Sequence, residues 1–245
     1  MVPIDAMKLL LLSNSTNAGE EYLGWPKQII KEFLDKYEVR KCLFIPYAGV
    51  TINFNDYTER VRNVFSLFHC EVVSIHTQTD PVKAVQEADC IVVGGGNTFR
   101  LVQLMHEKGI MSPIRDKVLS GTPFIGWSAG SNVACPSMKT TNDMPIVQPA
   151  SFDTLNLVPF QINPHYLDVN PEGHGGETRE QRIVEFLEVN RNINVVGLRE
   201  ACALYYEYGH LFLKGSRPMR IFHYHNPPIE VDASQDLDFL LHPAV

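Results

Sequence analysis

The sequence predicts an α/β fold in which helices cover both faces of a mostly parallel sheet. Residues 7–133 alternate short apolar runs with longer segments of helical periodicity, an order that joins parallel strands through helices. The apolar runs are continuous, as expected of strands buried on both faces. No linker, repeat or low-complexity tract interrupts the chain, so we expect residues 1–245 to form a single domain.

Each element of the alternating region has its own signal. Continuous apolar runs predict five strands, at Leu9–Leu12, Cys42–Ile45, Val72–Ile75, Ile91–Val93 and Phe124–Trp127. Apolar residues at helical spacing predict helices at Glu20–Tyr37, at Asn55–Phe68 and from Thr98 through Met105. Asp80 followed by Pro81 predicts the start of a short helix, with Asp80 as N-cap and Pro81 as the first helical residue.

The pattern changes in the second half of the chain. Residues 134–200 are expected to carry loops and one helix, Thr178–Val189, whose start is a capping-box sequence. Residues 201–245 are expected to be β-rich, because short apolar runs follow one another at hairpin spacing. Residues 1–6 have no structural signal and are interpreted as a leader before Met7.

Composition excludes several classes of function. The net charge of −7 and the lack of Lys/Arg tracts argue against nucleic acid and against an anionic membrane surface as partners. No apolar run approaches the roughly 20 residues of a membrane span. The five cysteines are widely spaced and form no Cys-x-x-Cys pair, which is typical of reduced thiols in a cytoplasmic protein.

The most informative motif is Gly126-Trp-Ser128-Ala-Gly130, which follows the strand ending at Trp127. Gly-x-Ser-x-Gly is typical of a strand-to-helix elbow that exposes a nucleophilic serine. The elbow would also direct the backbone N–H of Ala129 toward the space where an oxyanion forms. The alternative is a tight turn that needs glycine and merely contains a serine, and the motif alone does not decide between the two.

A serine nucleophile needs a base, and a base needs an acid. His165 is the candidate base, because the apolar run before it can form a strand that ends at the same sheet edge as Ser128. Two acids are candidates to orient it. Glu200 follows an apolar strand, whereas Asp143 lies in a Thr-Asn-Asp sequence where a local turn role is natural, so we favour Glu200.

Gly94–Thr98 also follows a strand and so lies at the same expected edge. It is not a phosphate loop of the common kinds, because Gly-x-x-x-x-Gly-Lys is absent and Phe99 fills the last place of Gly-x-Gly-x-x-Gly. We favour the interpretation that it supplies a second oxyanion-hole N–H. His223-x-His225 has the spacing of a metal pair on a strand but no apparent third ligand, so we interpret both as solvated strand residues.

Six stretches of the chain together resemble the signature blocks of the peptidase E family of alpha-aspartyl dipeptidases. They are Leu10–Thr16, Gly94–Phe99, Gly126–Gly130, Thr140–Val147, Ile162–His165 and Pro171–Ile183. The resemblance runs from Met7 to about Glu200, and it implies a flavodoxin-like sheet related to class I glutamine-amidotransferase domains. It implies cytoplasmic hydrolysis of dipeptides that begin with aspartate, without metal or cofactor. The chain departs from the family pattern at Arg199, where bacterial relatives carry proline.

The resemblance also implies roles for individual residues. Ser128 matches the nucleophile and His165 the base, while the third member matches either Glu200 or Asp143. The oxyanion donors match Gly96 and Ala129. Arg179 matches the arginine that holds the aspartyl carboxylate of the substrate, and we expect Asn97 to contact the substrate as well.

Two other functions are compatible with these residues. One is hydrolysis of aspartyl-arginine links, as in the related cyanophycinases. The other is a binding module that kept the elbow without catalysis, which would predict no covalent labelling of Ser128. The sequence leaves the oligomeric state open, a homodimer included.

Overall fold

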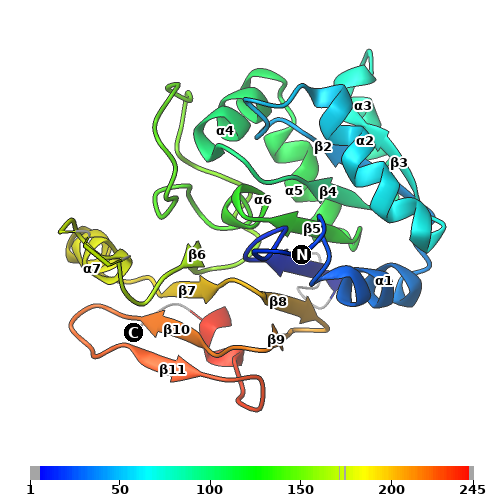
Figure 1. The fold of residues 1–245 in the computed structure, drawn as a ribbon. Coiled ribbons are helices and arrows are strands. Elements are labelled where there is room, and N and C mark those ends of the chain that lie inside the picture. The colour runs from blue at the N-terminus through cyan, green and yellow to red at the C-terminus, as the bar shows by residue number, and fades with distance from the viewer. Residues whose placement is uncertain (1–5, 171, 174, 243–245) are drawn as a thin grey trace.

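The computed structural model describes residues 6–170, 172–173 and 175–242, and its larger sheet has seven strands in the order β3-β2-β4-β5-β1-β8-β9. Five of them are parallel: β1 Lys8–Leu12, β2 Lys41–Ile45, β3 Glu71–Ser74, β4 Ile91–Val93 and β5 Phe124–Trp127. Their order matches the flavodoxin-like succession 2-1-3-4-5, with β1 in the place of the last strand. The predicted fold class is therefore confirmed (Figure 1).

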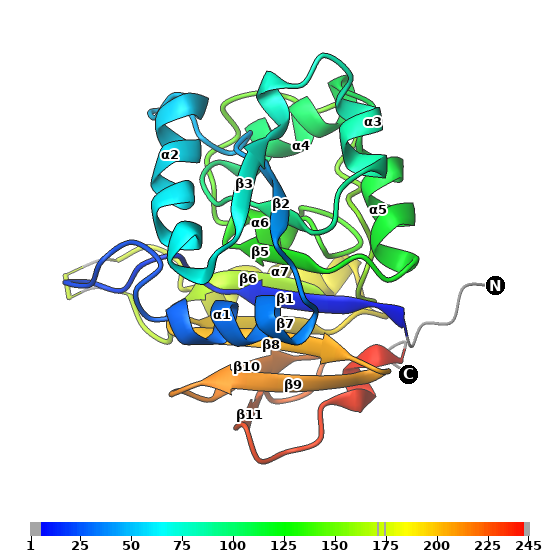
Figure 2. The same cartoon turned by 90° about the vertical axis from the view of Figure 1, so that its right-hand side faces the viewer.

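Helices cover both faces of this sheet, and alternation along the strands explains why. Leu9 and Leu11 belong to one core cluster, whereas Leu10 and Leu12 belong to the other. The second cluster packs under α1 Lys27–Lys36 and α2 Phe54–Phe65. The first packs under α3 Pro81–Gln86, α4 Thr98–Glu107, α5 Met111–Leu119 and α6 Ala129–Asn132. Figure 2 shows these two helical layers on either side of the strands.

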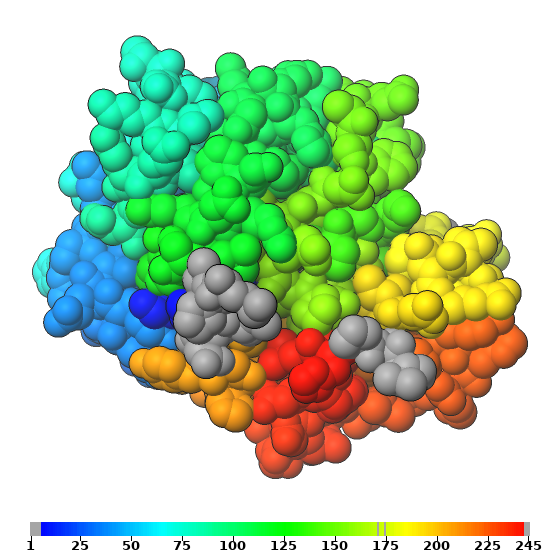
Figure 3. Space-filling model, turned by 180° about the vertical axis from the view of Figure 1, so that it is seen from behind, coloured from blue at the N-terminus to red at the C-terminus, as the bar shows by residue number. Residues whose placement is uncertain are grey.

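The larger sheet ends in an antiparallel hairpin. β8 Cys202–Glu207 pairs with β1, and β9 His210–Gly215 pairs with β8. The 3-10 helix Asp238–Leu241 packs against β9, where Asp238 accepts a hydrogen bond from the backbone N–H of Leu211 at 2.9 Å. From behind, this C-terminal segment is the red patch at the lower edge of the molecule (Figure 3).

A smaller sheet of four strands has the order β11-β10-β7-β6. It contains β6 Gln161–Tyr166, β7 Val195–Arg199, β10 Met219–Phe222 and β11 Ile229–Val231, and α7 Arg179–Val189 packs on it. β6 and β7 are parallel, and the other pairs are antiparallel. β7 leads into β8 of the larger sheet through Glu200 and Ala201, so the two sheets meet at this turn (Figure 1).

The structure corrects several element boundaries. The predicted helix Glu20–Tyr37 begins only at Lys27, because Pro26 stands before its first turn and the residues before it form turns with Leu23 at a positive φ. Asn55–Phe68 is an α-helix only to Phe65 and then narrows to a 3-10 turn. Helix α5 and strand β11 were not predicted, since their segments carry weak periodicity. Residues 1–5 of the predicted leader lie outside the described residues.

Candidate active site

Ser128 stands on a strained turn between β5 and α6. Its backbone has φ 53° and ψ −113°, a conformation that a residue with a Cβ rarely adopts. The two flanking glycines make the turn possible, because a Cβ on Gly126 would meet the carbonyl oxygen of Gly130 at 2.3 Å. A Cβ on Gly130 would in turn meet the carbonyl oxygen of Val93 at 2.1 Å. The sequence therefore folds here as the strand-to-helix elbow that the motif predicts.

His165 is brought to Ser128 by an irregularity in β6. The pairing of β6 with β7 shifts register between Pro164 and Tyr166, and His165 has a positive φ of 52°. A β-bulge of this kind redirects one side chain out of the strand. The imidazole consequently lies above the elbow, with Nε2 at 3.0 Å from the hydroxyl oxygen of Ser128.

Glu200 completes a linear arrangement with these two residues. Its Oε1 lies 2.8 Å from His165 Nδ1, the ring nitrogen that faces away from Ser128. A carboxylate at Nδ1 favours the tautomer whose Nε2 accepts a proton, because Nδ1–H then donates to the acid. The imidazole and the carboxylate are both about two-fifths exposed, so the group is open to a substrate.

Asp143, the other candidate acid, lies elsewhere in the site. Its Oδ2 accepts hydrogen bonds from the backbone N–H of Thr98 at 2.7 Å and from the hydroxyl of Thr98 at 2.6 Å. Thr141 donates a third hydrogen bond to the same oxygen at 3.0 Å. In the described part of the chain, Asp143 makes no hydrogen bond to His165. The structure thus brings Glu200, and not Asp143, to the imidazole.

Two backbone N–H groups near Ser128 are free to bind an oxyanion. Among the described residues, neither Gly96 nor Ala129 donates its N–H to a protein group. Gly96 has a φ of 135°, and a Cβ there would meet the carbonyl oxygen of Ala48 at 2.2 Å, so only glycine fits. Ala129 opens α6 directly after Ser128, where a helix leaves its first N–H groups unpaired.

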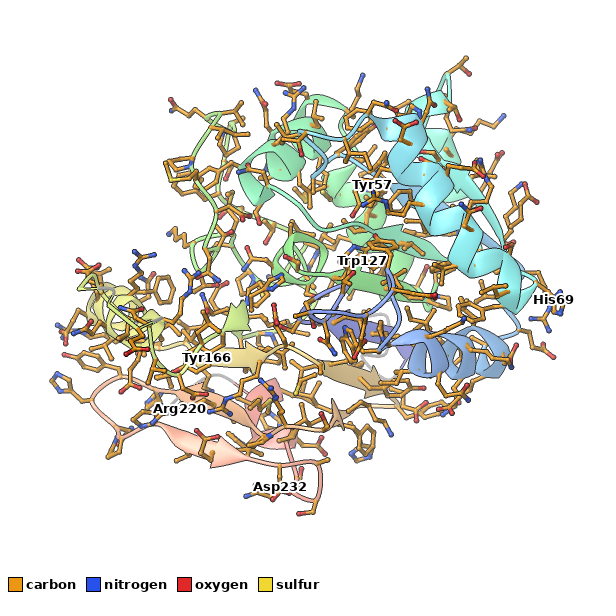
Figure 4. All side chains as sticks on the ribbon, viewed as in Figure 1. Tyr57, His69, Trp127, Tyr166, Arg220 and Asp232 are labelled. Atoms are coloured by element: carbon orange, nitrogen blue, oxygen red, sulfur yellow. The ribbon has the colours of Figure 1, made fainter. Side chains whose placement is uncertain are left out.

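Ser128, His165 and Gly96 line a cavity of about 690 Å³ at the carboxyl ends of β1, β2, β4 and β5, where ligands bind in sheets of this type. Trp127 and Tyr57 line its inner wall, and the Trp127 indole donates to the Tyr57 hydroxyl at 3.2 Å (Figure 4). Arg179, the first residue of α7, also lines the cavity. It is half-buried and has no ion pair or hydrogen bond to any described residue.

Asn97 lines the cavity, but its amide group is engaged. It caps α4 by accepting from the backbone N–H of Arg100 at 3.0 Å, and its Nδ2 donates to the carbonyl oxygen of Met144 at 2.8 Å. Within the described ranges, no three His, Cys, Asp or Glu side chains are grouped as a metal site would need. His225 Nε2 lies 3.8 Å from a carboxylate oxygen of Glu188.

Ser13 and Asn14 directly follow β1 and are fully buried, and the signature block Leu10–Thr16 that contains them gave them no role. The hydroxyl of Ser13 accepts the backbone N–H of His165 at 2.9 Å and donates to the carbonyl oxygen of Leu198 at 2.7 Å. Asn14 Oδ1 accepts the N–H of Ala201, the residue after Glu200, at 3.0 Å. The available signal was two small polar residues directly after a buried strand.

The chain matches the model of peptidase family S51 over residues 9–214. The chain belongs to peptidase family S51. It is 50% identical over 237 residues to peptidase E of Nostoc sp., covering 97% of this chain and 98% of that protein. It is 48% identical over 216 residues to peptidase E of Shigella flexneri, covering 88% and 93% of the two chains.

Two solved structures have the same fold. A peptidase from an acI-B1 Actinobacterium aligns with a TM-score of 0.70 at 16% identity, covering 95% of this chain and 98% of the other. A putative peptidase E from Listeria monocytogenes aligns with a TM-score of 0.63 at 23% identity, covering 86% and 98%. At these identities the likeness concerns the fold alone.

Family membership confirms the expected class of enzyme. The chain is a serine-type dipeptidase of the peptidase E family, the alpha-aspartyl dipeptidases. A binding module without catalysis is therefore not supported, and neither is the cyanophycinase alternative, since both relatives are named peptidase E. Among the described residues, no helix is long and apolar enough to cross a membrane.

Proposed function

We propose that Ser128, His165 and Glu200 form the catalytic triad that hydrolyses dipeptides with an N-terminal aspartate. The supporting observation is the position of the His165 imidazole, 3.0 Å from the hydroxyl of Ser128 on one side and 2.8 Å from Glu200 on the other. This spacing lets His165 take a proton from the serine while Glu200 holds the ring and stabilises the imidazolium that forms.

The first half of the reaction forms an acyl-enzyme. The Ser128 oxygen attacks the carbon of the scissile peptide bond, and its proton moves to Nε2 of His165. The negative charge that develops on the carbonyl oxygen is stabilised by the N–H groups of Gly96 and Ala129. His165 then gives the proton to the leaving nitrogen, so the C–N bond breaks and the second amino acid departs with a free amine.

The second half regenerates the enzyme. A water molecule gives one proton to His165 and attacks the ester carbon of aspartyl-Ser128. The same N–H groups stabilise the second tetrahedral intermediate, and its collapse returns the proton from His165 to the serine oxygen. The products are free aspartate and the restored triad.

Arg179 is proposed to select the aspartyl side chain. It lines the same cavity as Ser128, and no described residue forms an ion pair with its guanidinium. Burial is the main influence that lowers the pKa of Arg179, so its charge is partly desolvated. A planar guanidinium in this state can bind a carboxylate through two parallel hydrogen bonds. Asn97 acts through its cap on α4 and its bond to Met144.

A cytoplasmic location is part of the same proposal. All five cysteines are buried free thiols, which suits a reducing compartment. The substrate is a small molecule that a cavity of about 690 Å³ can enclose. Association into a homodimer stays a prediction.

The deciding experiment replaces the nucleophile. Ser128→Ala should lower kcat on Asp-Leu by about 10⁴-fold or more, since only oxyanion and binding contributions are left. Release of free aspartate is the measurement, and an unchanged melting temperature shows that the variant is folded. The matched control is Ser66→Ala, which alters an exposed hydroxyl on the far end of α2 and should leave kcat unchanged. Near-normal turnover by Ser128→Ala would refute the triad.

A further inference from the structure

Asp143 lies in the cavity with one carboxylate oxygen fixed and the other free. The fixed oxygen, Oδ2, accepts three hydrogen bonds from Thr98 and Thr141. Oδ1 accepts none from any described residue. Because three donors hold Oδ2, the direction of the carboxylate is set, and Oδ1 is left as an unpaired acceptor in a residue that lines the cavity beside Ser128.

The cavity therefore contains two opposite charges that do not neutralise each other. Burial, and after it repulsion from Arg182, lower the pKa of Arg179, whereas the charge of Asp143 raises it. The two opposite charges therefore interact electrostatically within the cavity. They nevertheless form no ion pair in the described part of the chain. Two complementary charges held apart in one cavity can be bridged by a ligand that carries both signs.

An N-terminal aspartate carries such a pair of charges. Its α-ammonium and its β-carboxylate sit on neighbouring carbons, about 3–4 Å apart by standard bond lengths. We propose that Oδ1 of Asp143 binds the α-ammonium of the substrate while Arg179 binds the β-carboxylate. This inference rests on the proposed function, and it gives Asp143 a binding role in place of the triad role that the sequence left open.

The assignment predicts that a free amino terminus is required. A peptide in which aspartate is internal or acylated has no ammonium and would leave Oδ1 facing an apolar or carbonyl group. An unpaired carboxylate in a partly desolvated cavity is costly, so such substrates are rejected. Recognition of both charges also fixes the first residue in orientation, which places its carbonyl carbon against Ser128.

The test compares two substrates that differ only in the ammonium. Asp-Leu carries it, whereas succinyl-leucine keeps the carboxylate and the scissile amide but has hydrogen in place of the amine. We expect Asp143→Asn to lower kcat/KM for Asp-Leu by about 30-fold or more, the usual loss for one partner of a desolvated charge pair. For succinyl-leucine, kcat/KM should change by no more than about 2-fold. The ratio of kcat/KM for Asp-Leu to kcat/KM for succinyl-leucine should therefore fall by at least about 15-fold in the variant.

The ratio of kcat/KM for the two substrates distinguishes a binding role of Asp143 from a structural role. Asp143 also caps α4 beside Gly96, so a purely structural role would lower kcat/KM for both substrates equally and overturn the inference. An unchanged ratio with unchanged rates would overturn it as well. The control is Asp153→Asn, since Asp153 is exposed and its carboxylate makes no hydrogen bond or ion pair with any described residue. It should alter neither rate.

A binding measurement distinguishes failure here from failure of the proposed function. In Ser128→Ala, calorimetry should show that L-aspartate binds more tightly than succinate and that the added Asp143→Asn change removes the difference. If wild-type enzyme fails to hydrolyse Asp-Leu but this pattern is found, the proposed function fails and the ammonium site stands. If hydrolysis is normal and aspartate and succinate bind equally in Ser128→Ala, the ammonium site fails alone.

Discussion

Three residues of the active site hold backbone conformations that side chains normally avoid. Ser128, His165 and Ala201 all have φ between 52° and 63°. Each such residue costs about 1–3 kcal/mol and persists only where its surroundings hold it. Ser13 and Asn14 provide that support for two of the three, because they accept hydrogen bonds from the backbone N–H groups of His165 and Ala201. The end of β1 therefore positions both the base and the turn that carries the acid.

A substitution of Ser13 tests this positioning role. Ser13→Ala removes the acceptor of the His165 N–H, so the imidazole should lose its fixed place above the elbow. We expect kcat to fall by about 10²-fold, the effect of displacing a catalytic group by about 1 Å, with KM nearly unchanged. Ser13→Thr retains the hydroxyl and should restore part of kcat. A parallel rise in KM, or no rescue by threonine, would contradict a positioning role.

The sequence predicted the chemistry-bearing residues better than their supports. Gly126 and Gly130 frame Ser128 in a recognisable motif, and a strand preceding His165 and Glu200 placed both at the sheet edge. Ser13 and Asn14 lie in the signature block Leu10–Thr16, but that block assigned them no role, because they bind backbone groups about 150 and 190 residues away along the chain. Only the paired strands bring these groups together.

Among the elements, β7 ends in Arg199, the residue at which the resemblance leads one to expect proline. Arg199, its last residue, is buried, and it binds Asp168 through two hydrogen bonds of 2.9 and 2.5 Å. It binds Glu230 of β11 through two more at 2.8 Å. It also donates to the carbonyl oxygen of Pro218 at 2.7 Å. This residue joins β7 to β11 across the intervening β10, directly before Glu200.

Arg199→Ala should therefore destabilise the smaller sheet. Its two carboxylate partners are half-exposed, so we expect a loss between the roughly 1 kcal/mol of an exposed pair and the roughly 3–5 kcal/mol of a buried one. Urea unfolding measures the change. Arg40→Ala removes an arginine whose pair with Asp35 is exposed, and it should cost less than about 0.5 kcal/mol. Equal losses in the two variants would show that the Arg199 network contributes nothing.

Element prediction succeeded where local signals were strong and failed where tertiary pairing decided. Phe124–Trp127 and Ile91–Val93 were predicted with their observed bounds, because turn residues end both runs. The hairpin β8–β9 was expected within the β-rich C-terminal part without a partner strand, and it extends the larger sheet through the pairing of β8 with β1. The apolar pattern of a strand indicates which of its faces is buried but not which strand lies beside it. The pairing of β8 with β1 could therefore not be predicted from the sequence.

The whole molecule brings its active site together from two sheets. Ser128 and the oxyanion groups follow strands of the larger sheet, whereas His165 belongs to the smaller one. Glu200 stands in the turn between them. The contacts that hold the two sheets and their helices together therefore affect both stability and catalysis. Carboxylate side chains make several of these contacts.

Glu207 is one such carboxylate, because it ties β8 to α1. Burial alone would raise its pKa, but hydrogen bonds from Lys36, Tyr37 and Tyr205 outweigh burial and lower it. Hydrogen bonding to Arg199 is the main cause that lowers the pKa of Asp168. In the unfolded chain these groups titrate near their ordinary values of about 3.9 for Asp and 4.3 for Glu.

The sign of the pH dependence follows from these shifts. A carboxylate whose pKa is lower in the folded state stabilises the fold above its unfolded pKa, and this contribution is lost as the pH falls through the folded pKa. As the 28 acidic side chains lose their charge, the 21 Lys and Arg and the 9 His make the chain strongly positive. We therefore expect the free energy of unfolding to be maintained down to about pH 4 and to decline steadily below it.

Glu207→Gln isolates one contribution to this decline. The amide cannot ionise, so the variant should be less stable than wild type at pH 7, where Glu207 is charged and bonded to Lys36. The difference in unfolding free energy should shrink as the pH is lowered from 5 toward 2, because wild type then loses the same charge. Denaturant titrations at each pH measure both curves. A difference that stayed constant across this range would mean that Glu207 stabilises the fold by packing alone, and that its lowered pKa has no part in holding β8 to α1.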